Sequence, residues 1–484
     1  MRGRLSEPVD SSFLAFFRVW FGAVMAVDGL LNLVSGTVEH VWARPTFHFS
    51  YPGFAWVIAV PRPWMHVVFA ATVVLGVLVA LGLCYRVSAI LLAVGFTYTF
   101  LVERAAFQNH FYLLCLLSGL MAILPAHHRW SLDVRRGAVD ERLWAPSWTL
   151  WLLRLQIGVV YFFGGLAKLD PDWLTSGPVS GWIAGRFEGT WIAAPAILGG
   201  LTYLINWGGL GFDLLVVPGL LWARTRIFAF ASALLFHLSN AFIFTIGVFP
   251  WFMIGATVLF FSPQMPVRLL RRLTGKAAPA RPSRGATAHN LGRGSRWGTV
   301  LLGTYCGVQL LLPVRPWLYP GDASWTEEGH RFSWRMMLRE KRVLPPASRL
   351  ERDLPEWFPR GHHFAARTGG GRITWPVRPE RYLEPWQVDI MLRHPDLIRQ
   401  FCRGVAHDIA AQGVDDVEVY VNVWASLNGR RAQRLVDPLA NLASQEWTLG
   451  PSTWILPLRA HQLTAKVQGP YITTSESPPF RADR

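Results

Sequence analysis

Cysteine is scarce in this sequence. Its 484 residues include four cysteines, which stand far apart and lack the short spacing of paired zinc ligands. Three of the four fall in or beside apolar runs. Neither a disulfide framework nor a metal site is therefore expected, and the four positions are Cys84, Cys115, Cys306 and Cys402.

Acidic residues are also few relative to basic ones. The chain has 31 Asp and Glu against 47 Lys and Arg, a formal net charge of +16. A basic balance can indicate a nucleic-acid partner, but no nucleic-acid motif accompanies it. The arginines gather mainly in connections between apolar runs and in the C-terminal part, which is a distribution that membrane topology explains. We expect no nucleic-acid partner.

Apolar residues, in contrast, are abundant. They make up 51% of the chain, and the mean hydropathy is positive, which is typical of a membrane protein. A helix needs about 20 mostly apolar residues to cross the hydrocarbon core. The first run is too long for a signal-peptide core and is expected to be retained. About nine spans are predicted, at 13–34, 66–83, 87–102, 111–124, 148–167, 201–222, 226–246, 248–262 and 297–313.

The distribution of Lys and Arg predicts the orientation. With the N-terminus inside, the basic connections 125–147 and 263–296 both fall on the cytoplasmic side, as basic loops prefer. Residues 1–313 are then expected to form a multi-span transmembrane domain, with 263–296 as its basic cytoplasmic loop against anionic lipid. Residues 314–484 are expected to form an extracytoplasmic domain. The expected location is a bacterial cytoplasmic membrane.

Residues 314–484 differ in pattern from the apolar part. Residues 417–427 alternate with period two, as a half-buried strand does, and a helical pattern follows His394. The predicted fold class is therefore an α-helical integral membrane bundle followed by a β-rich α+β domain.

One lysine stands out because of its position. Lys168 ends the apolar run that begins at 148, and an Asp-Pro pair at Asp170 and Pro171 stops the helix just beyond it. Apolar surroundings disfavour the charged form of a lysine, so this side chain could be a neutral amine that acts as a base. The alternative is a lysine that extends to the membrane surface and anchors the helix end.

Two further polar sets lie where a membrane protein usually avoids them. Asn109 and His110 begin the short fourth run, and His237 and Asn240 lie one helical turn apart in the seventh. Intramembrane polar groups are costly and commonly face a cavity or one another, so each is a functional candidate. For His110 the alternative is an interfacial histidine bonded to a carbonyl. For His237 and Asn240 it is a hydrogen bond between helices.

The segment YFFGGLAKLDPDW, at 161–173, resembles the catalytic-lysine segment of vitamin K-dependent γ-glutamyl carboxylases, and the chain resembles a bacterial-type, HTTM-domain member of that family. Other segments agree in the same order and span most of 10–460. They lie at 81–88, 109–113, 130–133, 236–240, 246–249, 261–263, 332–337 and 424–430.

The resemblance implies which residues form the site. Lys168 matches the family's base, which deprotonates the hydroquinone, and His110 matches a residue that assists at the quinone oxygen. The remaining matches are to positions in or near the quinone pocket, and these are Asn109, His237, Asn240, Phe261 and Ser262.

The resemblance also implies a reaction. Reduced vitamin K, of the phylloquinone or menaquinone type, would be the cofactor, with O2 and CO2 as co-substrates and no metal. The hydroquinone is oxygenated to its epoxide, and the strong base formed on the way deprotonates a glutamate, which adds CO2 to give γ-carboxyglutamate. The chain would thus be a peptidyl-glutamate 4-carboxylase and vitamin K epoxidase, a carbon-carbon lyase. Its partners would be a glutamate-containing peptide or protein and membrane lipid.

Two alternatives remain open. Ala167 stands where the animal carboxylases carry a second lysine. A quinone epoxidase that does not carboxylate a peptide is therefore considered beside the carboxylase. The other alternative is a non-catalytic membrane module that binds a quinone or a lipid.

Overall fold

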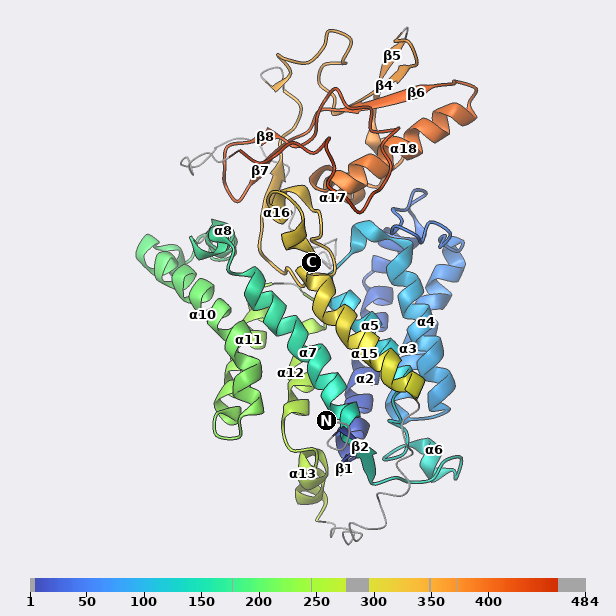
Figure 1. Ribbon diagram of the computed structural model, residues 1–484, viewed down its shortest axis with the longest axis vertical. Coiled ribbons are helices and arrows are strands. Elements are labelled where there is room, and N and C mark those ends of the chain that lie inside the picture. Colours follow the sequence, from blue (N-terminus) through green and yellow to red (C-terminus); the bar gives the residue numbers. More distant parts are fainter. Residues whose placement is uncertain are drawn as a thin grey trace.

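The computed structural model describes residues 5–175, 177–244, 246–275, 296–347, 350–371 and 373–459. A bundle of helices makes up most of the molecule, and a smaller domain with β-sheets lies at one end of it (Figure 1). The short sheet of β1 (Pro8–Asp10) and β2 (Trp144–Pro146) lies at the opposite end, together with α6 (Leu132–Arg135) and α13 (Met265–Thr274).

All nine predicted apolar segments are helical, but fewer of them are full spans. Among the described residues, seven helices are long and apolar enough to cross a membrane, or eight if a bent pair counts as one span. The seven are α2 (Ser12–Val34), α3 (Arg62–Leu81), α4 (Tyr85–Val102), α7 (Ser147–Ala167), α10 (Pro195–Leu221), α11 (Arg226–Ile243) and α15 (Arg296–Leu311) extended by η5 (Leu312–Leu318).

The predicted count of about nine spans compares with seven, or eight with the bent pair, and two of the predicted segments account for the difference. Helix α5 (Asn109–Ile123) has 15 residues, about 22 Å of helix, which is less than the roughly 30 Å of a hydrocarbon core. The eighth segment is α12 (Phe249–Thr257) with η4 (Val258–Phe260), and the chain then bends by 102° into α13. Part of the predicted loop 263–296 is therefore helical, and its residues 276–295 lie outside the described ranges.

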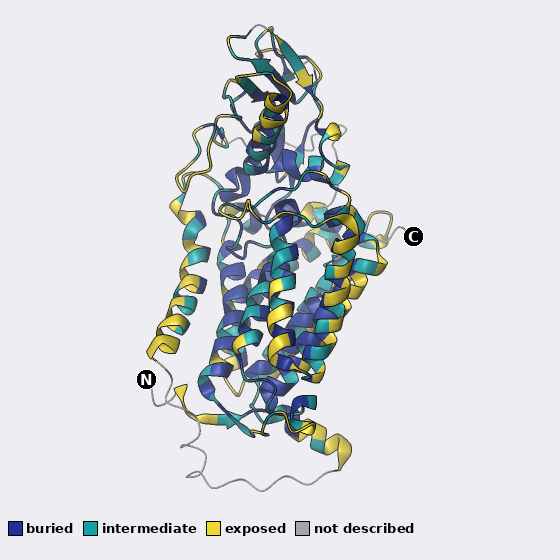
Figure 2. Cartoon of the chain, turned by 90° about the vertical axis from the view of Figure 1, so that its right-hand side faces the viewer, coloured by how far each residue is buried: buried dark blue, intermediate teal, exposed yellow. Residues whose placement is uncertain are grey.

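Exposed residues lie on the outer faces of the helices of the bundle, and buried residues gather inside it (Figure 2). Many of the exposed residues are large and apolar. Examples on three different spans are Ile90, Leu235 and Trp297, with 49%, 69% and 76% of their surface exposed. Hydrocarbon solvates such side chains as well as a protein core does, so these surfaces suit contact with lipid. The chain is a multi-pass membrane protein.

The C-terminal domain contains two three-stranded antiparallel sheets, as an α+β domain should. One has the order β3-β7-β8 and the other the order β5-β4-β6. Helix α18 (Pro395–Ala411) buries one face, which includes Leu397, Phe401 and Val405. The strands are β3 (Lys341–Val343), β4 (Phe364–Thr368), β5 (Thr374–Val377), β6 (Val417–Val421), β7 (Trp424–Leu427) and β8 (Gln433–Arg434).

Further short helices lie in the described part of the chain, several of them where the bundle meets the C-terminal domain. They are η1 (Glu39–Ala43), η2 (Arg104–Ala106), α8 (Pro171–Leu174), α9 (Gly177–Arg186), η3 (Trp191–Ala193), α16 (Ala323–Thr326), η7 (Pro379–Arg381) and α17 (Pro385–Arg393). Asp172 in α8 forms an ion pair with Arg430 and accepts a hydrogen bond of 2.7 Å from Asn428 Nδ2. The C-terminal domain is thus held against the segment that follows Lys168.

Glycines let α7 approach α10 closely. A Cβ at Gly165 would lie 2.7 Å from a side-chain carbon of Leu214, a distance that real Cβ atoms do not tolerate. One at Gly164 would lie 3.4 Å from Asp213 Oδ2. Gly165 therefore permits the close spacing between the helix that ends at Lys168 and the helix that faces it.

Candidate active site

A cavity of about 280 Å³ lies between the helical bundle and the C-terminal domain. Its membrane-side wall is formed by residues of α5, α7, α10, α11 and α12, and α8 and α9 add apolar side chains beside it. The opposite wall is formed by residues 327–341 and by α17 and its C-terminal end. Five of the seven predicted site residues line this cavity, namely Lys168, His110, Asn109, His237 and Asn240.

Lys168 is buried and paired. Its side chain is 8% exposed, and its Nζ forms an ion pair with Asp213 Oδ2. The Trp173 ring lies below the same nitrogen, with the ring centroid 5.2 Å away. The side chain passes over α10 at Gly209, where a Cβ would lie 3.9 Å from Lys168 Cε. Lys168 lies at the end of the apolar helix α7, as predicted, but it has a carboxylate partner that was not predicted.

Asn109 and His110 are the first two residues of α5, and both line the cavity. The His110 ring lies beside Phe249, with ring centroids 5.6 Å apart. Asn109 Nδ2 donates to the carbonyl oxygen of Arg335 at 3.4 Å, whereas Asn109 Oδ1 is buried without a partner among the described residues. A buried amide oxygen without a partner costs free energy, and a hydroxyl group of a ligand would satisfy it.

His237 combines both interpretations that the sequence left open. Its Nε2 lies 2.7 Å from the hydroxyl of Tyr161 in α7, which is a hydrogen bond between helices. The side chain also lines the cavity, and its Nδ1 is buried with no partner in the described part of the chain. Asn240, one turn further along α11, lines the same cavity.

Phe261 and Ser262 lie elsewhere. The backbone oxygen of Phe261 accepts a 3.0 Å hydrogen bond from Arg154 Nη2, in the first half of α7. Arg154 and Lys168 are separated by about 21 Å along that helix, at 1.5 Å per residue. Ser262 precedes Pro263, whose oxygen accepts from Ser12 Oγ at the start of α2. Neither residue is among those that line the cavity.

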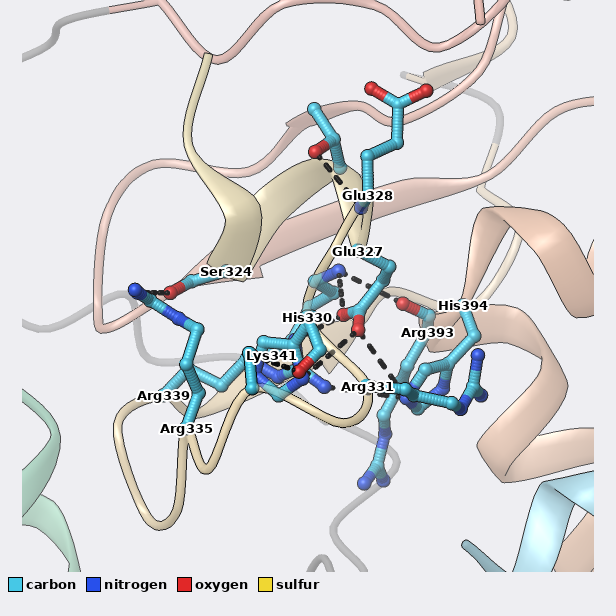
Figure 3. A network of polar contacts seen from close by, with 12 residues as sticks. Ser324, Glu327, Glu328, His330, Arg331, Arg335, Arg339, Lys341, Arg393 and His394 are labelled. Carbon is cyan, nitrogen blue, oxygen red and sulfur yellow. Dashed lines mark hydrogen bonds and ion pairs between the residues drawn. The ribbon is translucent and has the colours of Figure 1, made fainter. Parts of the chain in front are cut away.

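The wall from the C-terminal domain is charged. Glu327 at its centre is enclosed by Arg339 Nη1 at 2.5 Å and Lys341 Nζ at 2.8 Å, and the rings of His330 and His394 lie 4.0 and 3.8 Å from its Oε2 (Figure 3). We call these five residues the Glu327 cluster. Five cationic side chains line this wall in all, and they are Arg331, Arg335, Arg339, Lys341 and Arg393.

Burial and neighbouring charges set the protonation of the Glu327 cluster. Burial alone would raise the pKa of the Glu327 carboxyl, but Arg339 and Lys341 outweigh it and hold that pKa well below its usual value. Burial lowers the pKa of Lys341 to about 8, against the effect of Glu327. It likewise lowers the pKa of His394 to about 3. At neutral pH the cluster therefore contains a carboxylate, two cations and a neutral His394.

The neutral His394 predicts how stability depends on pH. The folded pKa of about 3 lies below the ordinary 6.5, so between these values the unfolded chain binds a proton that the folded chain does not. The apparent unfolding temperature should fall when the pH is lowered from about 7 to about 5, a range chosen because carboxylates titrate little there. His330, whose pKa burial also lowers, acts in the same direction.

Thermal unfolding of the purified protein across that range checks this prediction. His394→Gln should lose less stability on acidification than the wild type, and His407→Gln, on the exposed side of α18, should behave as the wild type does. Equal acid sensitivity of His394→Gln and wild type would contradict the assignment.

Sequence reasoning missed Asp213, Tyr161 and the Glu327 cluster. A signal for Asp213 was present, because it is the only charged residue of α10. It also continues a helical stripe of small or polar residues formed by Thr202, Asn206 and Gly209. The Glu327 cluster gave no comparable signal, since its members are spread from 327 to 394 in a part of the chain where charges are ordinary.

Two family models match the chain, one over the helical bundle and one mainly over the C-terminal domain. The model of the HTTM domain matches residues 6–265. The model of the vitamin K-dependent gamma-carboxylase, lumenal domain, matches residues 294–345 and 364–461. No solved structure matches the chain.

Proposed function

Because the chain belongs to the HTTM-domain family of vitamin K-dependent gamma-carboxylases, we propose that it is a membrane enzyme that couples two reactions. One is the oxygenation of reduced vitamin K to its epoxide. The other is the carboxylation of a protein glutamate to γ-carboxyglutamate. The cavity between the bundle and the C-terminal domain is proposed as the place where both occur.

The observation that carries this proposal is the convergence of Lys168, His110 and His237 on one cavity. They come from the end of α7, the start of α5 and the middle of α11, which are far apart in the sequence. If Lys168 only anchored a helix end and His110 were only an interfacial histidine, the two side chains would have no reason to line the same pocket. A binding site for a single ligand gives them one.

The pocket's lining suits a quinone. Val160, Phe236, Phe249 and Met253 give apolar and aromatic contacts, while Asn109 Oδ1 is a buried acceptor without a partner among the described residues. Its volume of about 280 Å³ is near the lower end of the roughly 300–1,000 Å³ common for ligand sites. The quinone ring would thus lie beside Asn109, His110 and Lys168, and its apolar tail would extend toward the bundle.

Lys168 is proposed as the base. A hydroquinone hydroxyl is a phenol, with an ordinary pKa of about 10, so it needs a nearby proton acceptor to ionise at neutral pH. Lys168 would take that proton, and His110 would donate or accept a hydrogen bond at a quinone oxygen. When bound and ionised, the hydroquinone would react with O2, and that reaction would generate the strong base that deprotonates glutamate. The apolar and aromatic side chains on the bundle side of the cavity would limit the access of water to that base.

The charged wall of the C-terminal domain is proposed to receive the glutamate. Arg335 lines the cavity with 8% of its residue surface exposed, and its Nη2 contacts Asp170 Oδ2 at 3.2 Å. Its Nε is buried without a partner among the described residues. A guanidinium held in this way can bind a carboxylate, and it would hold the substrate side chain near the residues around Lys168.

Purified protein in nanodiscs tests the proposal. It is given reduced vitamin K, O2, labelled CO2 and a short glutamate-containing peptide, and we expect vitamin K epoxide together with labelled peptide. Heat-inactivated protein and a peptide with glutamine in place of glutamate serve as controls. Epoxide without label would favour a quinone epoxidase. Neither product from folded protein, across several quinones and peptides, would contradict the proposal and favour a non-catalytic quinone- or lipid-binding module.

A further inference from the structure

We propose that Asp213 is the second half of the proton acceptor, so that Lys168 and Asp213 act as one unit when the hydroquinone is deprotonated. This inference rests on the proposed function. In this inference the proton acceptor is not an isolated neutral lysine but a pair of side chains. The pair holds one exchangeable proton before the reaction and two after it.

The contacts of Asp213 place it for this role. Its carboxylate is 6% exposed and forms an ion pair with Lys168 Nζ, and both residues line the cavity. The carboxylate lies directly against α7, because a Cβ at Gly164 would be in van der Waals contact with Asp213 Oδ2 at 3.4 Å. The close approach of α7 and α10 therefore serves to bring these two charged groups together.

The segment beyond Lys168 is fixed to the same helix. Trp173 Nε1 donates to the backbone oxygen of Asn206 at 3.0 Å, and Asn206 Nδ2 donates to the backbone oxygen of Trp173 at 2.9 Å. Asn206 and Asp213 are two helical turns apart on one face of α10. Helix α10 thus carries the carboxylate that pairs with Lys168 and, through Asn206, also binds the Trp173 indole that lies beside the Lys168 amine.

Tyr161 of α7 is another titratable group that lines the same cavity as Asp213. Its hydroxyl is bonded to His237 Nε2. Tyr161 and His237 are thus partners of each other, and Lys168 is the cation in contact with Asp213. A buried carboxylate and a buried amine in contact have the same number of protons and the same net charge whether the shared proton lies on nitrogen or on oxygen.

The proton step follows from this composition. The O–H bond of the hydroquinone breaks and an N–H bond forms at Lys168 Nζ, while a proton that the nitrogen held moves to Asp213 Oδ2. The hydroquinone leaves as a monoanion and no electron is transferred. The pair changes from net charge zero to +1, which compensates the new anion beside it. Lys168 need not be neutral beforehand, because Asp213 receives the proton that the amine gives up.

The pH dependence of epoxide formation tests the pair. In Asp213→Asn the amide cannot accept a proton, so the amine must be neutral before it reacts. We expect kcat to fall by about 10²-fold at neutral pH, with an unchanged KM for the hydroquinone. The rising limb of the pH profile should move to higher pH. Asp213→Glu, which keeps a carboxylate, should retain part of the activity and the wild-type profile.

Asp28→Asn is the matched control. Asp28 is a buried carboxylate of α2, with 7% of its surface exposed, and it lies outside the residues that line the cavity. This variant should keep the wild-type rate and profile. Thermal unfolding and quinone binding show whether Asp213→Asn is folded, and if it is not, Asp213→Glu provides the comparison.

The possible outcomes separate the hypotheses. An undiminished rate in Asp213→Asn would overturn the inference. So would a reduced rate whose rising limb stays in place or moves to lower pH, because Asp213 would then be a counter-ion or a structural residue only. In both cases epoxide formation by the wild type leaves the proposed function standing. Absence of epoxide from the wild type would overturn the proposed function itself.

Discussion

Replacing Lys168 with alanine should reduce epoxide formation by about 10²–10⁴-fold, the usual range for a lost general base. The variant should fail to carboxylate the peptide as well, because that step depends on the oxygenated quinone. Lys168→Arg should be equally inactive, since a guanidinium forms the ion pair with Asp213 but does not release its proton. Product formation is measured by chromatography of the quinone and by label in the peptide.

The structure offers a close control for this prediction. Leu169 is the next residue and is 51% exposed, so Leu169→Ala changes the same segment without touching the cavity. It should retain the wild-type rate. A Lys168→Ala protein that is folded and keeps more than about half of the wild-type rate would contradict a general-base role, whose loss is far larger.

The second large effect is expected in the KM for the glutamate peptide rather than in the KM for the hydroquinone. Arg335→Gln removes the guanidinium proposed to hold the substrate carboxylate. A hydrogen bond to a charged group contributes about 1.5–3 kcal/mol, so KM for the glutamate peptide should rise by roughly 10- to 150-fold. KM for the hydroquinone should change little, because the quinone ring is proposed to lie against Lys168 and His110.

Arg342→Gln is the matched control for Arg335. Arg342 lies in β3, is 38% exposed at its side chain, pairs with Glu340, and is outside the residues that line the cavity. Its substitution should leave both KM values near wild type. If Arg335→Gln raised the KM of the hydroquinone and left that of the peptide unchanged, the assignment of the charged wall to glutamate would be wrong.

The helices were predictable because their signal is local. Apolar runs gave all nine helical segments, and the Asp-Pro pair gave the end of α7 beside Lys168. What failed was the count of full spans, which depends on length and on bends. The fourth and eighth runs were predicted to be short, at 111–124 and 248–262, whereas the bend of 102° between η4 and α13 was not predicted.

The candidate site was predictable to the extent that polar residues are rare in apolar helices. That rule found Lys168, His110 and His237, which the fold brings to one cavity. Phe261 and Ser262 rested on resemblance alone, and no physical feature of that segment indicates a ligand. Asp213 and the Glu327 cluster depend on contacts between distant segments. Their roles follow from pairing, which a single sequence does not encode in a readable pattern.

An experimental structure with vitamin K bound in a lipid nanodisc tests the central claim most directly. We predict that the quinone ring lies in the cavity between the bundle and the C-terminal domain. One ring oxygen should be within hydrogen-bond reach of Lys168 Nζ, and His110 should lie beside the ring. A ring bound at another place, or bound in this cavity without contact to Lys168, would contradict the account.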